Sequence, residues 1–233
     1  MIEFDRFDVL TFDTYGTLID WEAGLLTAAR PVLAAHGAAA GDEQFLERYA
    51  AHEAALEAGP YMSYRQVLGR ALQAVGADLG FAPSAAEVAA FSGSVAAWPA
   101  FPDSADALAR LHTRFRLAVI TNCDDELFAR SEQRLGLRFD WVVTAQQARS
   151  YKPAAGPFEL AFATIDAPRE RILHVAQSRF HDHVTAKALG MTTVWVDRRH
   201  GREGSGATPP ADAAPDLTVP DMRTLADIAV GAT

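Results

Sequence analysis

Short apolar segments that alternate with helical patterns constrain the fold of this chain more than any other feature. The segments are rich in Val, Ile, Thr and Trp and lack clean alternation, which is typical of strands buried on both faces. This order predicts right-handed βαβ units, and therefore an α/β protein with a parallel sheet covered by helices on both sides. The expected strands cover residues 8–13, 117–122, 141–145, 172–177 and 192–197, and the expected helices cover 103–114, 124–136, 156–166 and 180–190.

A different pattern occupies residues 20–95. This stretch is alanine-rich, favours helix by propensity and contains no convincing strand. We therefore expect a four-helix domain over 20–95, inserted into a core domain formed by residues 1–19 and 96–233. Residues 201–216 are rich in Gly, Pro and Ala and are expected to form a loop.

The composition excludes several classes of protein. The 233 residues are 49% hydrophobic, which is enough for a substantial core, and the net charge of −9 argues against nucleic-acid and anionic-membrane partners. The single cysteine, Cys123, excludes an internal disulfide framework and a Cys-based zinc site. No basic leader with a long apolar stretch is present, and no apolar run approaches the roughly 18 residues of a spanning helix. We therefore expect a soluble cytoplasmic protein.

Polar side chains stand where the predicted strands end. In open parallel sheets, ligands bind beyond the carboxyl ends of the strands, so we expect these groups to converge on one edge. Gly16 allows the backbone to turn tightly behind the first carboxylate. The groups are Asp13, Thr121, Asn122, Lys152, Gln177, Ser178 and Asp182.

Four motifs in this order resemble those of the haloacid dehalogenase superfamily. They are D-x-x-G-T at Asp13, T-N at Thr121, Y-K-P around Lys152, and a late aspartate, Asp182, before a helix. The similarity extends from residue 8 to about residue 197. It implies a Rossmann-like core with a helical cap inserted after the first motif, and it implies that Asp13 is a nucleophile.

Two departures separate this chain from the phosphatases of that superfamily. Phosphatases resemble D-x-D at the first motif, where this chain has Tyr15, and G-D-x-x-x-D at the fourth, where it has Gln177. A phenol is a poor acid near neutral pH, and a neutral amide is a weak ligand for Mg²⁺. The "DTYGT" segment is instead similar to the 2-haloacid dehalogenase branch. That resemblance implies hydrolysis of short 2-haloacids through a covalent aspartyl ester, without metal or other cofactor.

The resemblance also implies catalytic roles. Asp13 attacks the carbon that bears the halogen, and water then hydrolyses the ester. Lys152 keeps Asp13 ionised and aimed, because a nearby opposite charge favours the carboxylate. Thr17 donates a hydrogen bond to Asp13, and Asp182 either orients Lys152 or activates water.

Substrate-binding roles follow from the same resemblance. Thr121 and the backbone amides of Thr14 and Tyr15 are expected to hold the substrate carboxylate. Asn122 occupies the position that cradles the leaving halide, and Gln177 is a candidate for positioning water. For the halide-binding arginine of the cap, the best positional match is Arg48, with Arg65 as a competitor.

Several alternatives stay open at the level of sequence. Phe158 stands where the family has a tyrosine, and either it packs in the core or a polar contact is lost. His181 and His183 are not expected to bind metal, because their spacing points the two rings apart. The rival functions are a magnesium-dependent phosphatase with unusual ligands and a non-catalytic relic that only binds a ligand. The similarity is compatible with a homodimer, although no exposed apolar stripe demands one.

Overall fold

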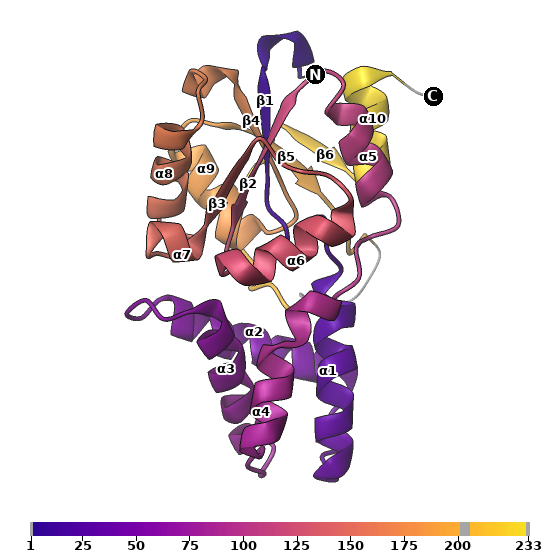
Figure 1. Ribbon diagram of the computed structural model, residues 1–233, viewed down its shortest axis with the longest axis vertical. Coiled ribbons are helices and arrows are strands. Elements are labelled where there is room, and N and C mark those ends of the chain that lie inside the picture. Colours follow the sequence, from indigo (N-terminus) through magenta and orange to yellow (C-terminus); the bar gives the residue numbers. More distant parts are fainter. Residues whose placement is uncertain (1, 201–205, 232–233) are drawn as a thin grey trace.

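A six-stranded parallel sheet forms the centre of the molecule, in the strand order β3-β2-β1-β4-β5-β6 (Figure 1). The computed structural model describes residues 2–200 and 206–231. The predicted α/β class and all five predicted strands are confirmed. The strands are β1 (Val9–Phe12), β2 (Arg116–Thr121), β3 (Trp141–Thr144), β4 (Ile172–Ala176), β5 (Thr192–Val196) and β6 (Leu217–Val219). The three-residue β6 was not predicted, because so short a strand carries no pattern of its own.

Both faces of the sheet are buried, as the apolar strands predict. Leu10 and Phe12 of β1 face one core layer, and Val9 faces the other. Helices α5, α6 and α10 lie on one side of the sheet, and α7, α8 and α9 on the other (Figure 1). Their bounds are α5 (Ser104–Leu111), α6 (Asp125–Leu135), α7 (Ala145–Ala148), α8 (Gly156–Thr164), α9 (Val184–Ala188) and α10 (Met222–Val230). A π-helical turn, Arg179–His183, precedes α9 within the region predicted as a single helix.

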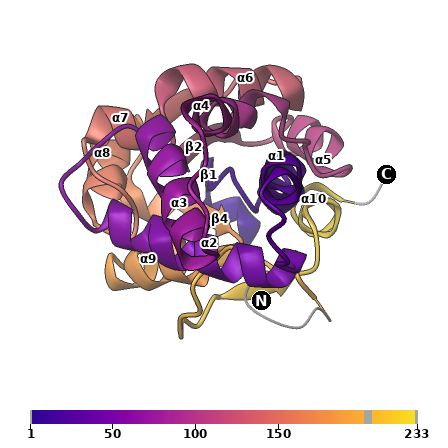
Figure 2. The same cartoon turned by 90° about the horizontal axis from the view of Figure 1, so that it is seen from below.

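Four helices occupy the chain between β1 and α5, and we call them the cap. They are α1 (Trp21–Ala35), α2 (Asp42–Glu57), α3 (Tyr64–Asp78) and α4 (Ala85–Ser92). Ser63 and Ser84 begin α3 and α4 with capping boxes, in which each serine and the third residue of its helix satisfy each other's backbone amides. The cap lies on one side of the core, and from below its helices lie in front of the central part of the core (Figures 1 and 2).

The two chain segments that join the cap to the core run side by side. Ile19 and Ala100 form an isolated antiparallel bridge, and the Asp20 amide donates to the carbonyl of Pro99 over 2.8 Å. This pairing of the two linkers holds the cap next to the loop that carries Asp13. None of the helices in residues 2–200 and 206–231 is both long and apolar enough to cross a bilayer.

Candidate active site

Asp13 follows β1 directly and is buried beneath the cap. Its Oδ2 accepts a 2.7 Å hydrogen bond from the Thr17 hydroxyl, and its Oδ1 accepts a 2.9 Å bond from Lys152 Nζ. Burial raises the pKa of Asp13 above its ordinary value, while the charge of Lys152 acts in the opposite direction. The structure therefore brings together Asp13, Thr17 and Lys152, as the sequence analysis expected.

Lys152 is 1% exposed and uses all three ammonium protons. Besides Asp13, Nζ donates to Asp182 Oδ1 over 2.6 Å and to the carbonyl of Ile120 over 2.7 Å. Burial lowers the pKa of Lys152, but the charges of Asp13 and Asp182 outweigh burial and raise it above its ordinary value. The ammonium is thus a fixed positive charge between two carboxylates.

Asn122 holds the backbone of Lys152. Its Nδ2 donates to the Lys152 carbonyl over 2.9 Å, and its Oδ1 accepts from the Lys152 amide over 2.8 Å. Nδ2 also donates to Glu57 Oε2 of the cap over 3.1 Å. The only asparagine of the chain therefore positions the lysine in addition to lining the pocket.

Asp182 is fully buried behind Lys152. Its Oδ1 also lies 3.0 Å from His174 Nε2. Burial acts to raise the pKa of Asp182, but Lys152 and the His174 hydrogen bond outweigh it and lower the pKa below its ordinary value. Of the two roles left open by the sequence, this position favours orientation of Lys152 over activation of a water in the pocket.

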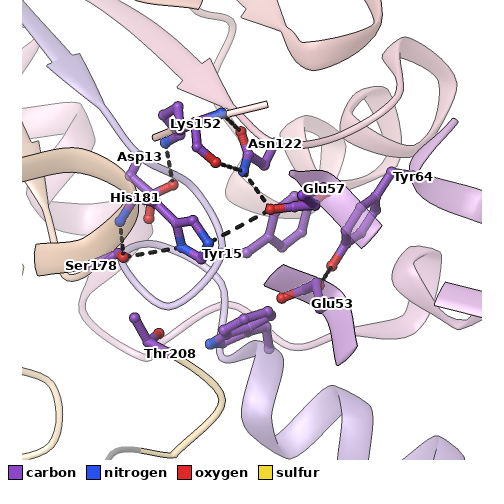
Figure 3. Close-up of a pocket in the computed structure, with 11 residues that line it drawn as sticks. Asp13, Tyr15, Glu53, Glu57, Tyr64, Asn122, Lys152, Ser178, His181 and Thr208 are labelled. Carbon is purple, nitrogen blue, oxygen red and sulfur yellow. Dashed lines mark hydrogen bonds and ion pairs between the residues drawn. The ribbon is translucent and has the colours of Figure 1, made fainter. Parts of the chain in front are cut away.

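A pocket lies between the strand ends and the cap (Figure 3). The core contributes side chains from the segments that follow β1, β2, β3, β4 and β5, and the cap contributes side chains from α1, α2 and α3. The lining residues are Asp13, Tyr15, Trp21, Glu53, Glu57, Tyr64, Asn122, Lys152, Ser178, His181 and Thr208.

The hydroxyl of Tyr15 faces away from the nucleophile. It lies 3.0 Å from Ser131 Oγ and 3.3 Å from Cys123 Sγ, both in buried positions. Burial raises the pKa of the Tyr15 phenol well above its ordinary value. Tyr15 therefore offers its ring to the pocket, while its hydroxyl is not placed to act as an acid at Asp13.

A set of unpaired polar groups lies next to Asp13. The hydroxyls of Thr14 and Thr121 are buried and make no hydrogen bond with the part of the chain that the structure describes. The backbone amides of Thr14 and Tyr15 also donate to no group within residues 2–200 and 206–231. The Thr121 hydroxyl and the two amides are the groups expected from the sequence to hold a substrate carboxylate, and the side chains of Thr14 and Thr121 lie buried beside the pocket without lining it.

Gln177, an expected site residue, points away from the pocket, and Phe158, which stands where the family has a tyrosine, is buried in the core. The Gln177 amide donates to Thr17 Oγ1 over 2.8 Å, but its side-chain Oε1 accepts from Thr208 over 3.3 Å and does not line the pocket. Phe158 is fully buried edge-on against His174, with ring centroids 5.2 Å apart. Of the two readings left open for Phe158, packing is therefore correct.

Neither candidate arginine of the cap lines the pocket. Arg48 lies near the protein surface on α2, 3.6 Å from Asp78, and Arg65 lines a separate surface groove beside Asp124. The prediction that Arg48 binds the halide is wrong for this arrangement, because Arg48 lies outside the inward-facing stripe of α2. That stripe carries Phe45, Tyr49, Glu53 and Glu57 at intervals of four residues.

Glu53 and Glu57 line the pocket but were not predicted from the sequence. The signal was available: two carboxylates continue the apolar i, i+4 stripe of a helix, where a solvent-facing position is not expected. From the sequence, His181 was considered only as a metal ligand. In the structure it lies in the π-helical turn, with Nδ1 3.1 Å from Ser178 Oγ and Nε2 3.6 Å from Glu57 Oε2. Burial lowers the pKa of His181 to about 4, so the ring is neutral near pH 7.

The fold and the site together define a Rossmann-like enzyme with a helical cap over a buried aspartate and lysine. The sequence model of the haloacid dehalogenase-like hydrolases matches residues 7–177, and the chain belongs to that family. This confirms the family inferred from the four motifs.

Curated relatives and solved structures add detail. A haloacetate dehalogenase from Moraxella sp. (strain B) is 30% identical over 128 residues, which span only 54% of this chain and 54% of the relative. An (S)-2-haloacid dehalogenase from Pseudomonas putida is 26% identical over 86% of this chain and 90% of its own length. L-2-haloacid dehalogenase from Xanthobacter autotrophicus with covalently bound chloropropionic acid has a TM-score of 0.80, 21% identity, and coverage of 97% and 100%. A magnesium-bound HAD-hydrolase from Bacillus subtilis has a TM-score of 0.79, 18% identity, and coverage of 96% and 99%, so structural similarity at this level shows the fold alone.

Proposed function

We propose that this protein hydrolyses the carbon–halogen bond of short 2-haloacids through a covalent ester on Asp13, without a metal ion. The observation that carries the proposal is the Lys152 ammonium, 2.9 Å from Asp13 Oδ1 and 2.6 Å from Asp182 Oδ1 at the floor of the pocket. It supplies the positive charge that keeps a buried carboxylate available as a nucleophile. The dehalogenase relatives support the choice of carbon–halogen chemistry.

The proposed reaction has two steps. A carboxylate oxygen of Asp13 forms a bond to C2 of the substrate, while the C2–halogen bond breaks and the halide leaves with the electron pair. Water then adds to the carbonyl carbon of the Asp13 ester and the bond from that carbon to the ester oxygen breaks, which releases the 2-hydroxyacid and restores the carboxylate. One proton of the water ends on the hydroxyl of the product, and the other is released to solvent. Division of one displacement into two steps is the use of covalent catalysis, and Lys152 is placed to stabilise the negative charge on the Asp13 carbonyl oxygen.

The substrate carboxylate is proposed to lie against the Thr121 hydroxyl and the backbone amides of Thr14 and Tyr15. These donors are buried beside the nucleophile and have no hydrogen-bond partner among the described residues. Buried donors without partners are costly, and an anionic ligand would satisfy them. This placement orients C2 toward Asp13.

The site residues do not fit the magnesium ion that related phosphatases use. The Tyr15 hydroxyl is turned toward Ser131, and Gln177 is turned toward Thr208. Asp182 Oδ1 is engaged by Lys152 and His174, and its Oδ2 has no hydrogen-bond partner among the described residues. No three His, Cys, Asp or Glu side chains converge as metal ligands in residues 2–200 and 206–231. The donor set therefore suits an ammonium-assisted nucleophile better than a divalent cation.

The test is halide release from chloroacetate, fluoroacetate and 2-chloropropionate by the wild type, Asp13→Asn and Arg48→Ala. We expect Asp13→Asn to lose the activity and Arg48→Ala to keep it, because Arg48 lies outside the pocket. A single turnover in H₂¹⁸O, with enzyme in excess, should place the label on residue 13 by mass spectrometry. Unchanged rates in Asp13→Asn would refute the assignment, and phosphate-ester hydrolysis that requires Mg²⁺ would support the rival phosphatase.

A further inference from the structure

We propose that the cap side of the pocket binds an ammonium group, so that the preferred substrate is a 2-haloacid that carries an amino group at its other end. The inference rests on the proposed function for the carboxylate end and the halogen. It adds the chemical class of the remainder of the substrate.

Two glutamates of α2 form the cap wall of the pocket (Figure 3). Glu53 is 2% exposed, and its Oε1 accepts from the hydroxyls of Tyr49 and Tyr64 over 2.8 and 2.9 Å. Glu57 is 9% exposed, and its Oε2 accepts from Asn122. The other oxygen of each carboxyl, Glu53 Oε2 and Glu57 Oε1, accepts no hydrogen bond from the described residues. Each glutamate therefore has an acceptor free for a ligand.

Within the described residues, no cationic side chain donates a hydrogen bond to either glutamate, although the charge of Lys152 acts to lower the pKa of Glu57. Lys152 is the only lysine or arginine among the described residues that line the pocket, and its three protons already go to Asp13, Asp182 and Ile120. Burial raises the pKa of Glu53 to about 7, and burial together with the charge of Glu53 raises the pKa of Glu57 well above its ordinary value. A buried carboxyl pair without a cation is unfavourable, and a ligand cation would offset that cost.

An independent observation also points to a ligand at this wall. His181 is 8% exposed and lines the pocket, and its Nε2 makes no hydrogen bond with residues of the described chain. The neutral ring can accept a proton donor at that nitrogen when Nδ1 carries the proton. The ring nitrogen of His181 is therefore a further unpaired acceptor on the lining of the pocket, beside the two glutamates.

The remaining wall is aromatic, which suits an organic cation. The rings of Tyr15 and Tyr64 stack with centroids 6.4 Å apart, and Trp21 lies on the same pocket. Ring faces attract ammonium groups, most strongly where water is excluded. A metal ion fits less well, since the described residues offer no group of three ligands.

The two ends of the pocket then select a zwitterion. The carboxylate lies at the core side against Thr121, and the ammonium lies at the cap side between Glu53 and Glu57. The compound 3-amino-2-chloropropionate meets both requirements, and 2-chloropropionate is its matched partner, with methyl in place of aminomethyl. We expect kcat/KM for the amino compound to exceed that of its partner by about 10–100-fold, the value of one hydrogen bond between charged groups.

The variants Glu53→Gln and Glu57→Gln keep the shape of the wall and remove the charge. We expect each to lower the ratio of the two kcat/KM values toward one. The control is Glu47→Gln, an exposed glutamate on the same helix, which should keep the preference. Enzyme-free halide release is subtracted for both compounds.

A binding measurement separates this inference from the proposed function. Calorimetry with Asp13→Asn compares β-alanine with propionate, which differ by the same ammonium group. Tighter binding of β-alanine than of propionate, lost in Asp13→Asn/Glu57→Gln, supports the ammonium site. If this preference is found but neither haloacid is hydrolysed, only the dehalogenase proposal fails. Turnover of 2-chloropropionate with no gain from the amino group, and no preference for β-alanine, overturns the ammonium site and leaves the dehalogenase proposal standing.

Discussion

Replacement of Lys152 by methionine tests the central feature of the site. Lys152 is 1% exposed and is the only cation between Asp13 and Asp182, so Lys152→Met leaves two buried carboxyl groups without their counter-charge. Removal of one partner from a buried ion pair costs about 3–5 kcal/mol. We expect a loss of this size in the free energy of unfolding at pH 8, and halide release below detection.

The chain provides a matched control, because its only other lysine is Lys187. Lys187 pairs with Asp216 at the surface, where the side chains are 33% and 38% exposed, and such pairs contribute about 0–1 kcal/mol. Lys187→Met should therefore resemble the wild type in stability and in activity. The two variants change the same atoms in different environments.

The assay is urea denaturation at pH 8 and pH 5, followed by circular dichroism. In Lys152→Met the buried carboxyls bind protons more tightly in the folded state than in the unfolded state, so the variant gains relative stability as the pH falls. The difference from the wild type should be smaller at pH 5 than at pH 8. A Lys152→Met protein as stable as Lys187→Met at pH 8 would refute the claim that this ammonium compensates the two aspartates.

Two further predictions follow from the same contacts. Thr17→Val removes the hydrogen-bond donor to Asp13 Oδ2 and leaves the backbone amide of Gln177 without its acceptor, so the free energy of unfolding should fall by about 1–3 kcal/mol. Loss of the donor should also raise the pKa of Asp13 and move the acidic limb of the pH–rate profile to higher pH. An unmoved limb would contradict the role of Thr17. The pKa of Glu53 is raised to about 7, so the folded state binds the proton of this carboxyl more tightly than the unfolded state does. The free energy of unfolding should therefore fall by up to about 3 kcal/mol as the pH rises from 5 to 8. Glu53→Gln should reduce this fall in urea titrations at the two pH values, and an equal fall in both proteins would count against the assigned pKa.

Much of the core part of the site could be predicted because the order of the strands determines where the reactive side chains lie. Asp13 and Lys152 are 139 positions apart in the chain, yet each follows the end of a strand or its loop on one edge of the sheet, and their side chains meet at 2.9 Å. A parallel sheet places all carboxyl ends together, so sequence order alone was enough to group them. The hydrogen bond from Thr17 to Asp13 was predicted for the same reason, since both residues lie in one tight turn.

The cap was less predictable because helix content does not determine which side of a helix faces the site. The propensity for helix over residues 20–95 was clear, but Arg48 was selected by its position along α2 and not by the side to which it points. Packing of Phe45 and Tyr49 against the other cap helices sets the rotation of α2, and this rotation directs Glu53 and Glu57 inward. The direction of a side chain on an inserted helix depends on contacts that no local pattern contains.

The stability of the fold does not require the two buried glutamates of the cap, Glu53 and Glu57. A glutamine at position 53 could still bond both tyrosines, and an apolar residue at position 57 would avoid burial of a carboxyl whose pKa is forced upward. Local choices that conflict with stability are expected where a site binds its ligand. Under the proposed function, the core motifs determine which bond is broken, and under the proposed ammonium site Glu53 and Glu57 determine which substrate is preferred.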